Sequence, residues 1–179
     1  VDNVQGARLA VEHLIRLGHR RIGMITNAPT TYVAAHQRLE GYRQALDGAG
    51  LPYDEHLVRY GNFDEQSGEV AMRELLAATP PPTAVFVASD MVALGALKAI
   101  WDQGLRVPED VALVGFDDIT TARFTTPPLT TVHVPALRLG EEAGKVLLDV
   151  MEFGFTTRSQ VLLQTTLVVR ASCGATTSR

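Results

Sequence analysis

The sequence lacks several features that would settle its class at once. It has one cysteine among 179 residues, which excludes an internal disulfide framework and a cysteine-rich metal site. No apolar run approaches the roughly 20 residues that a membrane-spanning helix needs. The net charge of −4 gives no strong positive field for nucleic acid. With 46% hydrophobic and 20% charged residues, the composition is that of an ordinary globular domain.

Motifs of catalysis and phosphate binding are also missing. The sequence contains no Gly-x-Ser-x-Gly, no Gly-x-x-x-x-Gly-Lys, no Gly-x-Gly-x-x-Gly and no His-Glu-x-x-His. Its five histidines have no spacing typical of a metal site. Cys173 lies in a short tail, where we expect no base beside it. The sequence therefore favours a site that holds a ligand without transforming it, with no metal and no cofactor.

Helical periodicity and short β-rich runs alternate along the first 128 residues. Helices are expected at about 2–18, 34–49, 64–78 and 90–104, and strands at 21–26, 57–60, 83–87 and 111–116. Because the strands are apolar on both faces, this order predicts an α/β fold, a parallel sheet with helices on both faces. After Pro128 we expect a strand at 129–134, a helix at 135–153, a β-like run at 161–169 and a frayed tail from Ser172.

The loops at one edge of this sheet are the expected ligand site. Right-handed crossovers bring the carboxyl ends of parallel strands to one edge, and ligands bind outside those ends. The loops concerned are 27–36, 61–64, 88–91 and 116–128.

Two acids end the last of these strands. Asp117 or Asp118 can accept hydrogen bonds from vicinal hydroxyls, and either can instead brace the loop. Neighbours on extended backbone point in opposite directions, which argues against a catalytic pair. Arg38 lies early in the second helix. Its planar guanidinium can donate hydrogen bonds to hydroxyls or to a carboxylate, or Arg38 can be a solvated helix residue.

Three further side chains follow the expected strands at this edge. Phe63 can stack on the apolar face of a sugar or a base, or belong to the core. Asp90 is expected to cap the helix that follows it. Ser89 is the better candidate for a ligand contact.

Several runs, in order, resemble the effector-binding domain of bacterial lactose/galactose repressor-type (LacI/GalR) transcriptional regulators. They include GARLAVEHLIRLGHRRIG (6–23), RLEGY (38–42), PTAVF (82–86), SDMVALGA (89–96), GLRVPEDV (104–111), VGFDD (114–118) and PPLTTV (127–132). Each run alone is a weak signal, whereas the ordered set is specific and covers nearly the whole chain.

The resemblance implies a periplasmic-binding-protein-like fold of two lobes around a cleft. Residues 1–133 would form most of the C-terminal lobe, 134–160 would return to the N-terminal lobe, and 161–179 would come back and end in a flexible tail. The chain opens without methionine, so we expect truncation at the N-terminus, with the helix-turn-helix and most of the N-terminal lobe missing.

The resemblance also implies roles for particular residues. The effector-binding positions are Asp117, Arg38, Phe63, Ser89 and Tyr32. Tyr32 stands where purine-binding members have a polar residue, which favours a sugar or related polyol. Leu94 and Phe124 match surfaces that family members use to form homodimers.

The resemblance therefore implies the sensing and dimerisation region of a cytoplasmic regulator. A sugar-like effector would control operator binding allosterically, and DNA would be contacted only by a helix-turn-helix absent from this chain. The alternative is a periplasmic sugar-binding component of a transporter. A third possibility, a sugar hydrolase using Asp117 as an acid or base, lacks a motif that supports it.

Overall fold

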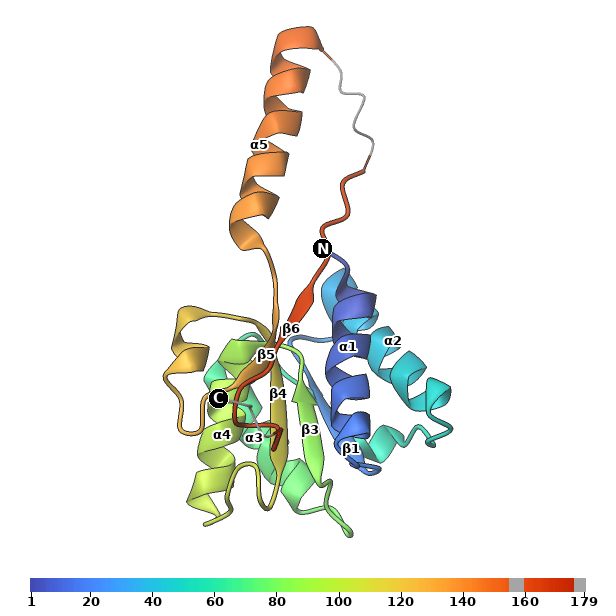
Figure 1. Ribbon diagram of the computed structural model, residues 1–179, viewed down its shortest axis with the longest axis vertical. Helices are drawn as coiled ribbons and strands as arrows, with labels where there is room; N and C mark the ends of the chain where they lie inside the picture. The colour runs from blue at the N-terminus through green and yellow to red at the C-terminus, as the bar shows by residue number, and fades with distance from the viewer. Residues whose placement is uncertain (155–159, 176–179) are drawn as a thin grey trace.

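The computed structural model describes residues 1–154 and 160–175, which are built around one six-stranded sheet (Figure 1). Its strand order is β2-β1-β3-β4-β5-β6. The strands are β1 (Ile22–Thr26), β2 (Val58–Tyr60), β3 (Ala84–Val87), β4 (Ala112–Asp117), β5 (Thr130–His133) and β6 (Thr166–Val168). The first five pair in parallel, and β6 runs antiparallel to β5.

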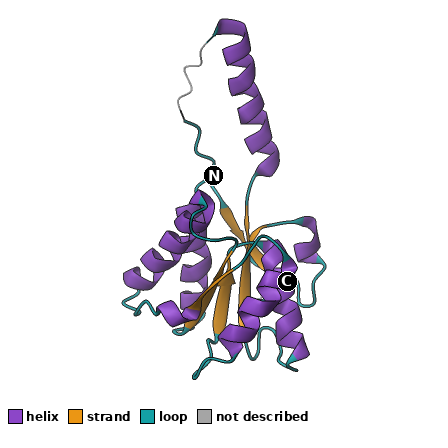
Figure 2. Cartoon of the chain, turned by 180° about the vertical axis from the view of Figure 1, so that it is seen from behind, coloured by secondary structure: helices purple, strands orange, loops and turns teal. Residues whose placement is uncertain are grey.

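Helices cover both faces of this sheet (Figure 2). One face carries α1 (Asn3–Arg16) and α2 (Val33–Gly48), and the other carries α3 (Glu65–Leu76) and α4 (Asp90–Asp102). Short 3-10 turns occupy Glu55–Leu57 and Thr120–Arg123. Successive strand residues supply two separate cores, with Phe86 packed on the α1–α2 side and Val85 and Val87 on the other. The predicted α/β fold is confirmed.

The chain after β5 departs from the expectations in two places. Of the β-like run expected at 161–169, only the three residues of β6 form a strand. The prediction of a frayed tail from Ser172 onward is wrong for Ser172 and Cys173, which are both buried. The Ser172 hydroxyl donates to the carbonyl oxygen of Leu113 at 2.7 Å and accepts from the amide of Thr130 at 2.8 Å. Residues 176–179 of the predicted tail lie outside the described residues.

Helix α5 (Ala136–Phe153) stands away from the sheet (Figure 1). None of its residues is buried, and Leu137, Leu148 and Met151 are more than 60% exposed. The segments that join it to the sheet body, residues 1–3, 134–135 and 163–165, are called the neck below. The amide of Asp2 donates to the carbonyl of Leu163 at 2.9 Å across the neck. In the described residues, no helix is both long and apolar enough to cross a membrane.

Helices α3 and α4 cross at two glycines. A Cβ atom at Gly95 would lie 1.7 Å from the carbonyl oxygen of Glu65, and one at Gly68 would lie 1.9 Å from that of Val92. Both obstacles are backbone atoms, which cannot rotate out of the way. The absence of side chains at these two positions therefore sets the distance between the helices.

We predict that Gly95→Ala lowers the free energy of unfolding by about 3 kcal/mol, the upper range for an overpacked core. Chemical unfolding followed by circular dichroism measures this. Gly48→Ala is the matched control, because nothing lies within 4 Å of its added Cβ. Alanine is the better helix former, so this control is expected to be neutral or stabilising. Equal stability of Gly95→Ala and wild type would contradict the close crossing.

Asp90 does not cap α4 as the sequence suggested. Asp64 does cap α3, through the amide of Ser67, but Asp90 is the first residue of α4 and its carboxylate turns into the core. It accepts from the hydroxyl of Thr131 at 2.7 Å and from the amide of Ile119 at 2.9 Å. The fully buried Asp90 thus fastens the loop after β4 to β5.

Burial raises the pKa of Asp90 from 3.8 to about 7, although its two hydrogen bonds act in the opposite direction. A pKa that is higher in the folded state means that stability is greatest below about pH 4 and declines as the pH rises through 7. We predict that wild type loses stability relative to Asp90→Asn over this interval. Unfolding by urea at a series of pH values measures the difference, and parallel curves would contradict it. Burial raises the pKa of Asp117 as well, but Asp117 is present in both proteins, so the difference between them reports the ionisation of Asp90 together with its repulsion by Asp117.

Candidate ligand-binding site

The carboxyl ends of four adjacent parallel strands carry the predicted site residues. Phe63 follows β2, Tyr32 follows β1, Ser89 follows β3, and Asp117 ends β4. Phe63, Asp117 and Asp118 have φ values of 67°, 118° and 57°, and the other left-handed residues of the described chain are glycines. Such backbone costs of order 1–3 kcal/mol per residue and is typical of functional sites.

Arg38 is buried rather than solvated, with 8% of its surface exposed. Its guanidinium lies 3.8 Å from the centre of the Phe116 ring. Nε donates to the side-chain oxygen of Asn3 at 3.0 Å, and Nη1 donates to the carbonyl of Ala88. Nη2 lies 3.6 Å from Oδ1 of Asp117. Each of the guanidinium nitrogens therefore has a partner in the protein, and the group is held in one orientation.

Asp117 faces Arg38 and keeps about a third of its side chain exposed. Burial raises its pKa, while the positive charge of Arg38, the hydroxyl of Ser89 and the backbone amide of Asp90 counter the rise. Burial likewise lowers the pKa of Arg38, against the opposing influence of Asp117 and Asp90. The structure thus brings Arg38, Asp117 and Ser89 together as a hydrogen-bonding cluster that remains open on one side.

The aromatic side chains form a second group at the same edge. Tyr32 and Phe63 meet edge to face, with ring centres 5.1 Å apart and planes at 87°. They are 53% and 50% exposed, so Phe63 does not belong to the core. The amide of Phe63 donates to the carbonyl of Asn27 at 2.8 Å, which fixes the ring beside the end of β1. Exposed aromatic rings of this kind suit the apolar face of a sugar.

Asp118 braces the structure, one of the two roles that the sequence left open for this acid pair. Its side chain is 10% exposed and has other partners than that of Asp117. Oδ1 accepts from Arg170 at 2.6 Å, and Oδ2 lies 3.0 Å from Nδ1 of His133. The prediction that the two acids do not pair assumed extended backbone, whereas both residues have positive φ. The partners of Asp118 lie 52 and 15 residues away and leave no local signal.

Leu94 and Phe124 lie on the other side of the sheet from α1 and α2. Leu94 is half-buried in α4, and Phe124 follows the turn at Thr120–Arg123 with 75% of its surface exposed. Their part in a dimer stays a prediction.

Cys173 does have a base beside it, contrary to expectation. Nε2 of His13 lies 3.2 Å from its sulfur, and the hydroxyl of Thr130 donates to the same atom at 3.2 Å. Burial lowers the pKa of His13, with Arg16 acting in the same direction. The thiol is 1% exposed, so this contact packs the end of the chain and offers no nucleophile to a ligand.

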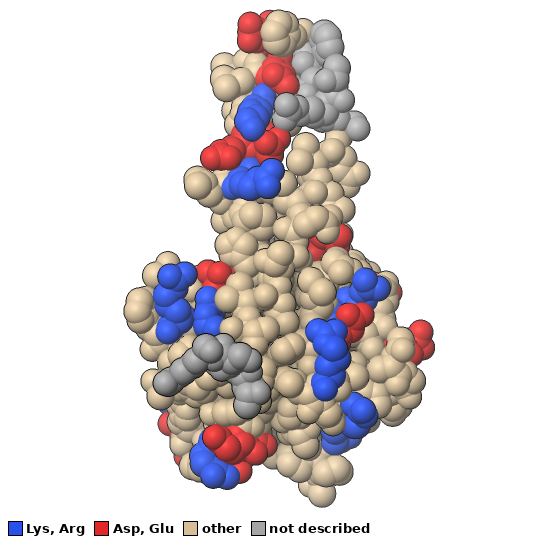
Figure 3. Space-filling view, viewed as in Figure 1, with Lys and Arg blue, Asp and Glu red and all other residues tan. Residues whose placement is uncertain are grey.

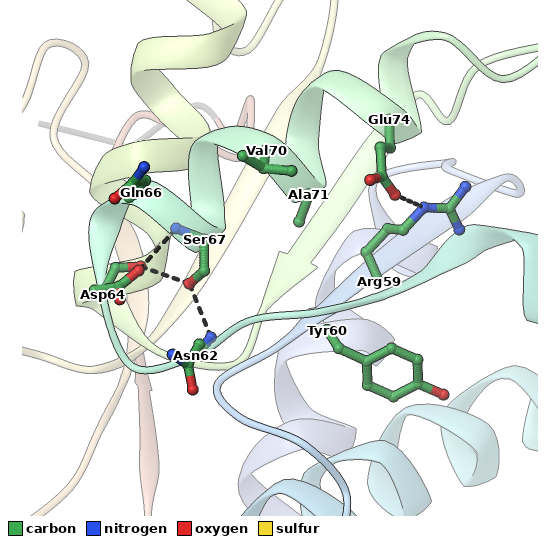
Figure 4. Close-up of a pocket in the computed structure, with 9 residues that line it drawn as sticks. All are labelled: Arg59, Tyr60, Asn62, Asp64, Gln66, Ser67, Val70, Ala71 and Glu74. Atoms are coloured by element: carbon green, nitrogen blue, oxygen red, sulfur yellow. Dashed lines mark hydrogen bonds and ion pairs between the residues drawn. The ribbon is translucent and has the colours of Figure 1, made fainter.

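Two hollows lie near this edge. One, of about 630 Å³, borders Asp117 and is lined by Asp117, Asp118, Ile119, Thr120, His133, Val134, Ala136 and Leu137. The other, of about 470 Å³, lies between β2 and α3 (Figure 4). Its polar groups bind one another: Arg59 pairs with Glu74 at 2.7 Å, and the amide of Asn62 donates to Ser67. Among the residues that the structure describes, no cluster of three or more acids, histidines or cysteines is arranged to hold a metal.

The sequence is similar to known regulators over most of its length. Residues 11–173 match the periplasmic binding protein-like domain. The HTH-type transcriptional regulator CelR of Thermobifida fusca is 47% identical over 172 residues, 96% of this chain and 50% of CelR. The HTH-type transcriptional repressor CytR of Escherichia coli K12 is 42% identical over 175 residues, 98% of this chain and 51% of CytR. The chain therefore spans about half the length of these relatives.

Solved structures agree with this assignment. The transcriptional regulator CelR–cellobiose complex superposes with a TM-score of 0.92 at 47% identity, covering 96% of this chain and 52% of that one. The lac repressor dimer bound to operator and the anti-inducer ONPF superposes with a TM-score of 0.87 at 35% identity, covering 95% and 58%.

The relatives named here are transcriptional regulators, and none is an enzyme or a transporter component. They support neither the hydrolase nor the transporter hypothesis. The chain belongs to the periplasmic binding protein-like domain family, in the form carried by LacI/GalR-type transcriptional regulators.

Proposed function

We propose that this chain is the effector-binding region of a sugar-responsive transcriptional regulator. The observation that carries the proposal is the convergence at one sheet edge of a carboxylate, a fixed guanidinium and a pair of exposed rings. Asp117 and Arg38 would hold vicinal hydroxyls, Ser89 would add a hydroxyl contact, and Phe63 with Tyr32 would cover an apolar face of the sugar. No group here is arranged to break a bond, so the ligand would leave unchanged.

The sheet body would be one lobe of a two-lobed domain. In this proposal, residues 1–133 form most of the C-terminal lobe, residues 134–160 belong to the N-terminal lobe, and the chain returns from 161 onward. The unburied apolar side chains of α5, with Leu137 79% and Met151 73% exposed, support a covering lobe from sequence upstream. That lobe would supply the second wall of the effector site.

A sugar or related polyol is the proposed class of effector. The relative with 47% identity was solved with cellobiose, which makes this β-linked disaccharide the first probe to test. Contacts that differ between two lobe arrangements would bias one global state, and a coupling of about 1–3 kcal/mol suffices for control of operator binding. The full protein would act as a cytoplasmic homodimer through Leu94 and Phe124, with DNA bound by an upstream helix-turn-helix.

We predict that Asp117→Asn in the full-length regulator weakens cellobiose binding roughly 10- to 150-fold, the usual worth of a charged hydrogen bond. Its melting temperature should stay close to wild type, because the neutral amide relieves the burial of a carboxylate but also removes the charge opposite Arg38, and the two effects oppose each other. Titration calorimetry and thermal unfolding measure the two effects. Asp110→Asn is the control, since Asp110 pairs with Arg106 at the surface. Wild-type affinity in Asp117→Asn would refute the assignment, and a wild type that binds neither cellobiose nor any other sugar would refute the proposed function.

Phe63→Ala tests the aromatic group separately. Removing an exposed ring costs the fold little, whereas loss of stacking should weaken sugar binding about tenfold, corresponding to roughly 1–1.5 kcal/mol. Trp101→Ala is the matched control, because Trp101 is a 44%-exposed ring near the opposite end of α4. Equal losses of affinity in the two variants would contradict a specific role for Phe63.

A further inference from the structure

We propose that Asp118 is a positioning residue that couples occupancy of the Asp117–Arg38 cluster to the geometry of the neck. The proposal rests on the proposed function and extends it from binding to transmission. Asp118 adjoins Asp117 in the chain, yet its carboxylate contacts neither Arg38 nor Ser89 in any described interaction. Its partners are His133, at the end of the strand that leads into the neck, and Arg170, two residues beyond the strand that leads out of it.

The two carboxylate oxygens of Asp118 bind two segments of the chain that are connected through the neck. Oδ2 lies 3.0 Å from His133, the last residue of β5, directly before the neck segment 134–135. Oδ1 accepts from Nη2 of Arg170 at 2.6 Å, two residues after β6, which leads out of the neck. One nearly buried carboxylate therefore ties the neck end of β5 to the chain that follows the far end of β6.

Arg170 is itself held tightly, so its contact with Asp118 can transmit a displacement. Its Nη1 donates to the carbonyl of Leu129 at 2.7 Å, and its amide donates to the hydroxyl of Thr130 at 2.9 Å. Only 15% of its side chain is exposed. A charge-assisted pair in such surroundings is shorter and stronger than one at the surface.

The backbone joins Asp117 and Asp118 into one rigid unit. Both residues have positive φ, a conformation that persists only where the surroundings enforce it. The carbonyl of Asp117 also accepts from the amide of Val134, in the neck, at 3.4 Å. A ligand that displaces the backbone of Asp117 then turns Asp118 as well.

The N-terminal segment of the neck, residues 1–3, also contacts the Asp117–Arg38 cluster. Asn3 accepts from Nε of Arg38 at 3.0 Å, and the neighbouring Asp2 is bonded to Leu163. The neck is mostly uncharged on the face seen in Figure 3. The charged groups that take part in these contacts at its base are therefore the ones best placed to control its geometry. Coupling between sites needs such a contiguous network with more than one arrangement.

The test uses Asp118→Asn in the full-length regulator, with Asp110→Asn as control. The coupling ratio is the operator Kd with saturating cellobiose divided by the operator Kd without it. We expect cellobiose affinity within threefold of wild type, but a coupling ratio that falls toward 1 in Asp118→Asn alone. Retention of the wild-type ratio would overturn the proposal, and so would parallel losses of affinity, coupling and melting temperature.

Arg170 supplies a second pair of variants. Arg170→Lys keeps the charge opposite Asp118 and should retain most of the coupling, whereas Arg170→Gln should lose it. Equal coupling in the two would overturn the proposal, whether or not Asp118→Asn folds.

A measurement without effector separates this inference from the proposed function. Hydrogen exchange of the full-length protein should become at least tenfold faster at Val134, Ala136 and residues 163–168 in Asp118→Asn, with α3 unchanged. Faster exchange confined to residues 118–119 would overturn the inference even where wild type responds to cellobiose. Faster exchange in the neck would support it even where cellobiose proves to be the wrong probe.

Discussion

The buried guanidinium of Arg38 is the constraint on which the ligand edge depends. A positive charge taken out of water is costly unless hydrogen bonds and an opposite charge compensate it. Here the compensation comes from Phe116, Asn3, the carbonyl of Ala88 and Asp117, which belong to different parts of the fold. The same contacts that make burial tolerable also fix the position of Asp117 and the start of the chain.

Asp117 and Asp118 show how one dipeptide serves two purposes. The first carboxylate is partly exposed and points at the site, and the second is nearly buried and binds His133 of β5 and Arg170. Asp90, a third acid nearby, ties the loop after β4 to β5 from below. Three acids lie close together, and burial raises the pKa of Asp90 chiefly, with smaller contributions from the charges of Asp117 and Asp118. The edge is therefore stable only because each acid has its own donors.

Local patterns in the sequence were sufficient to predict the helices, the strands and the edge of the sheet where the site lies. Apolar periodicity placed α5 within one residue, and strand ends predicted that Arg38, Ser89 and Asp117 would be neighbours. The direction of β6, the burial of Ser172 and Cys173 and the partners of Asp118 were not predictable in this way. Each depends on contacts between residues far apart in the chain, which no local pattern records. Asp90 was misjudged because an acid at a helix start usually caps, and here tertiary hydrogen bonds prevail over that preference.

The antiparallel pairing of β5 with β6 has a consequence for protein engineering. His133 and Thr166 are register partners, although the whole of α5 lies between them in the chain. Adjacent antiparallel strands can be joined by a two-residue turn such as Asn-Gly. Replacing residues 134–165 by such a hairpin would remove the exposed leucines of α5 and leave a minimal scaffold, on which the ligand edge could be redesigned without its opposite wall.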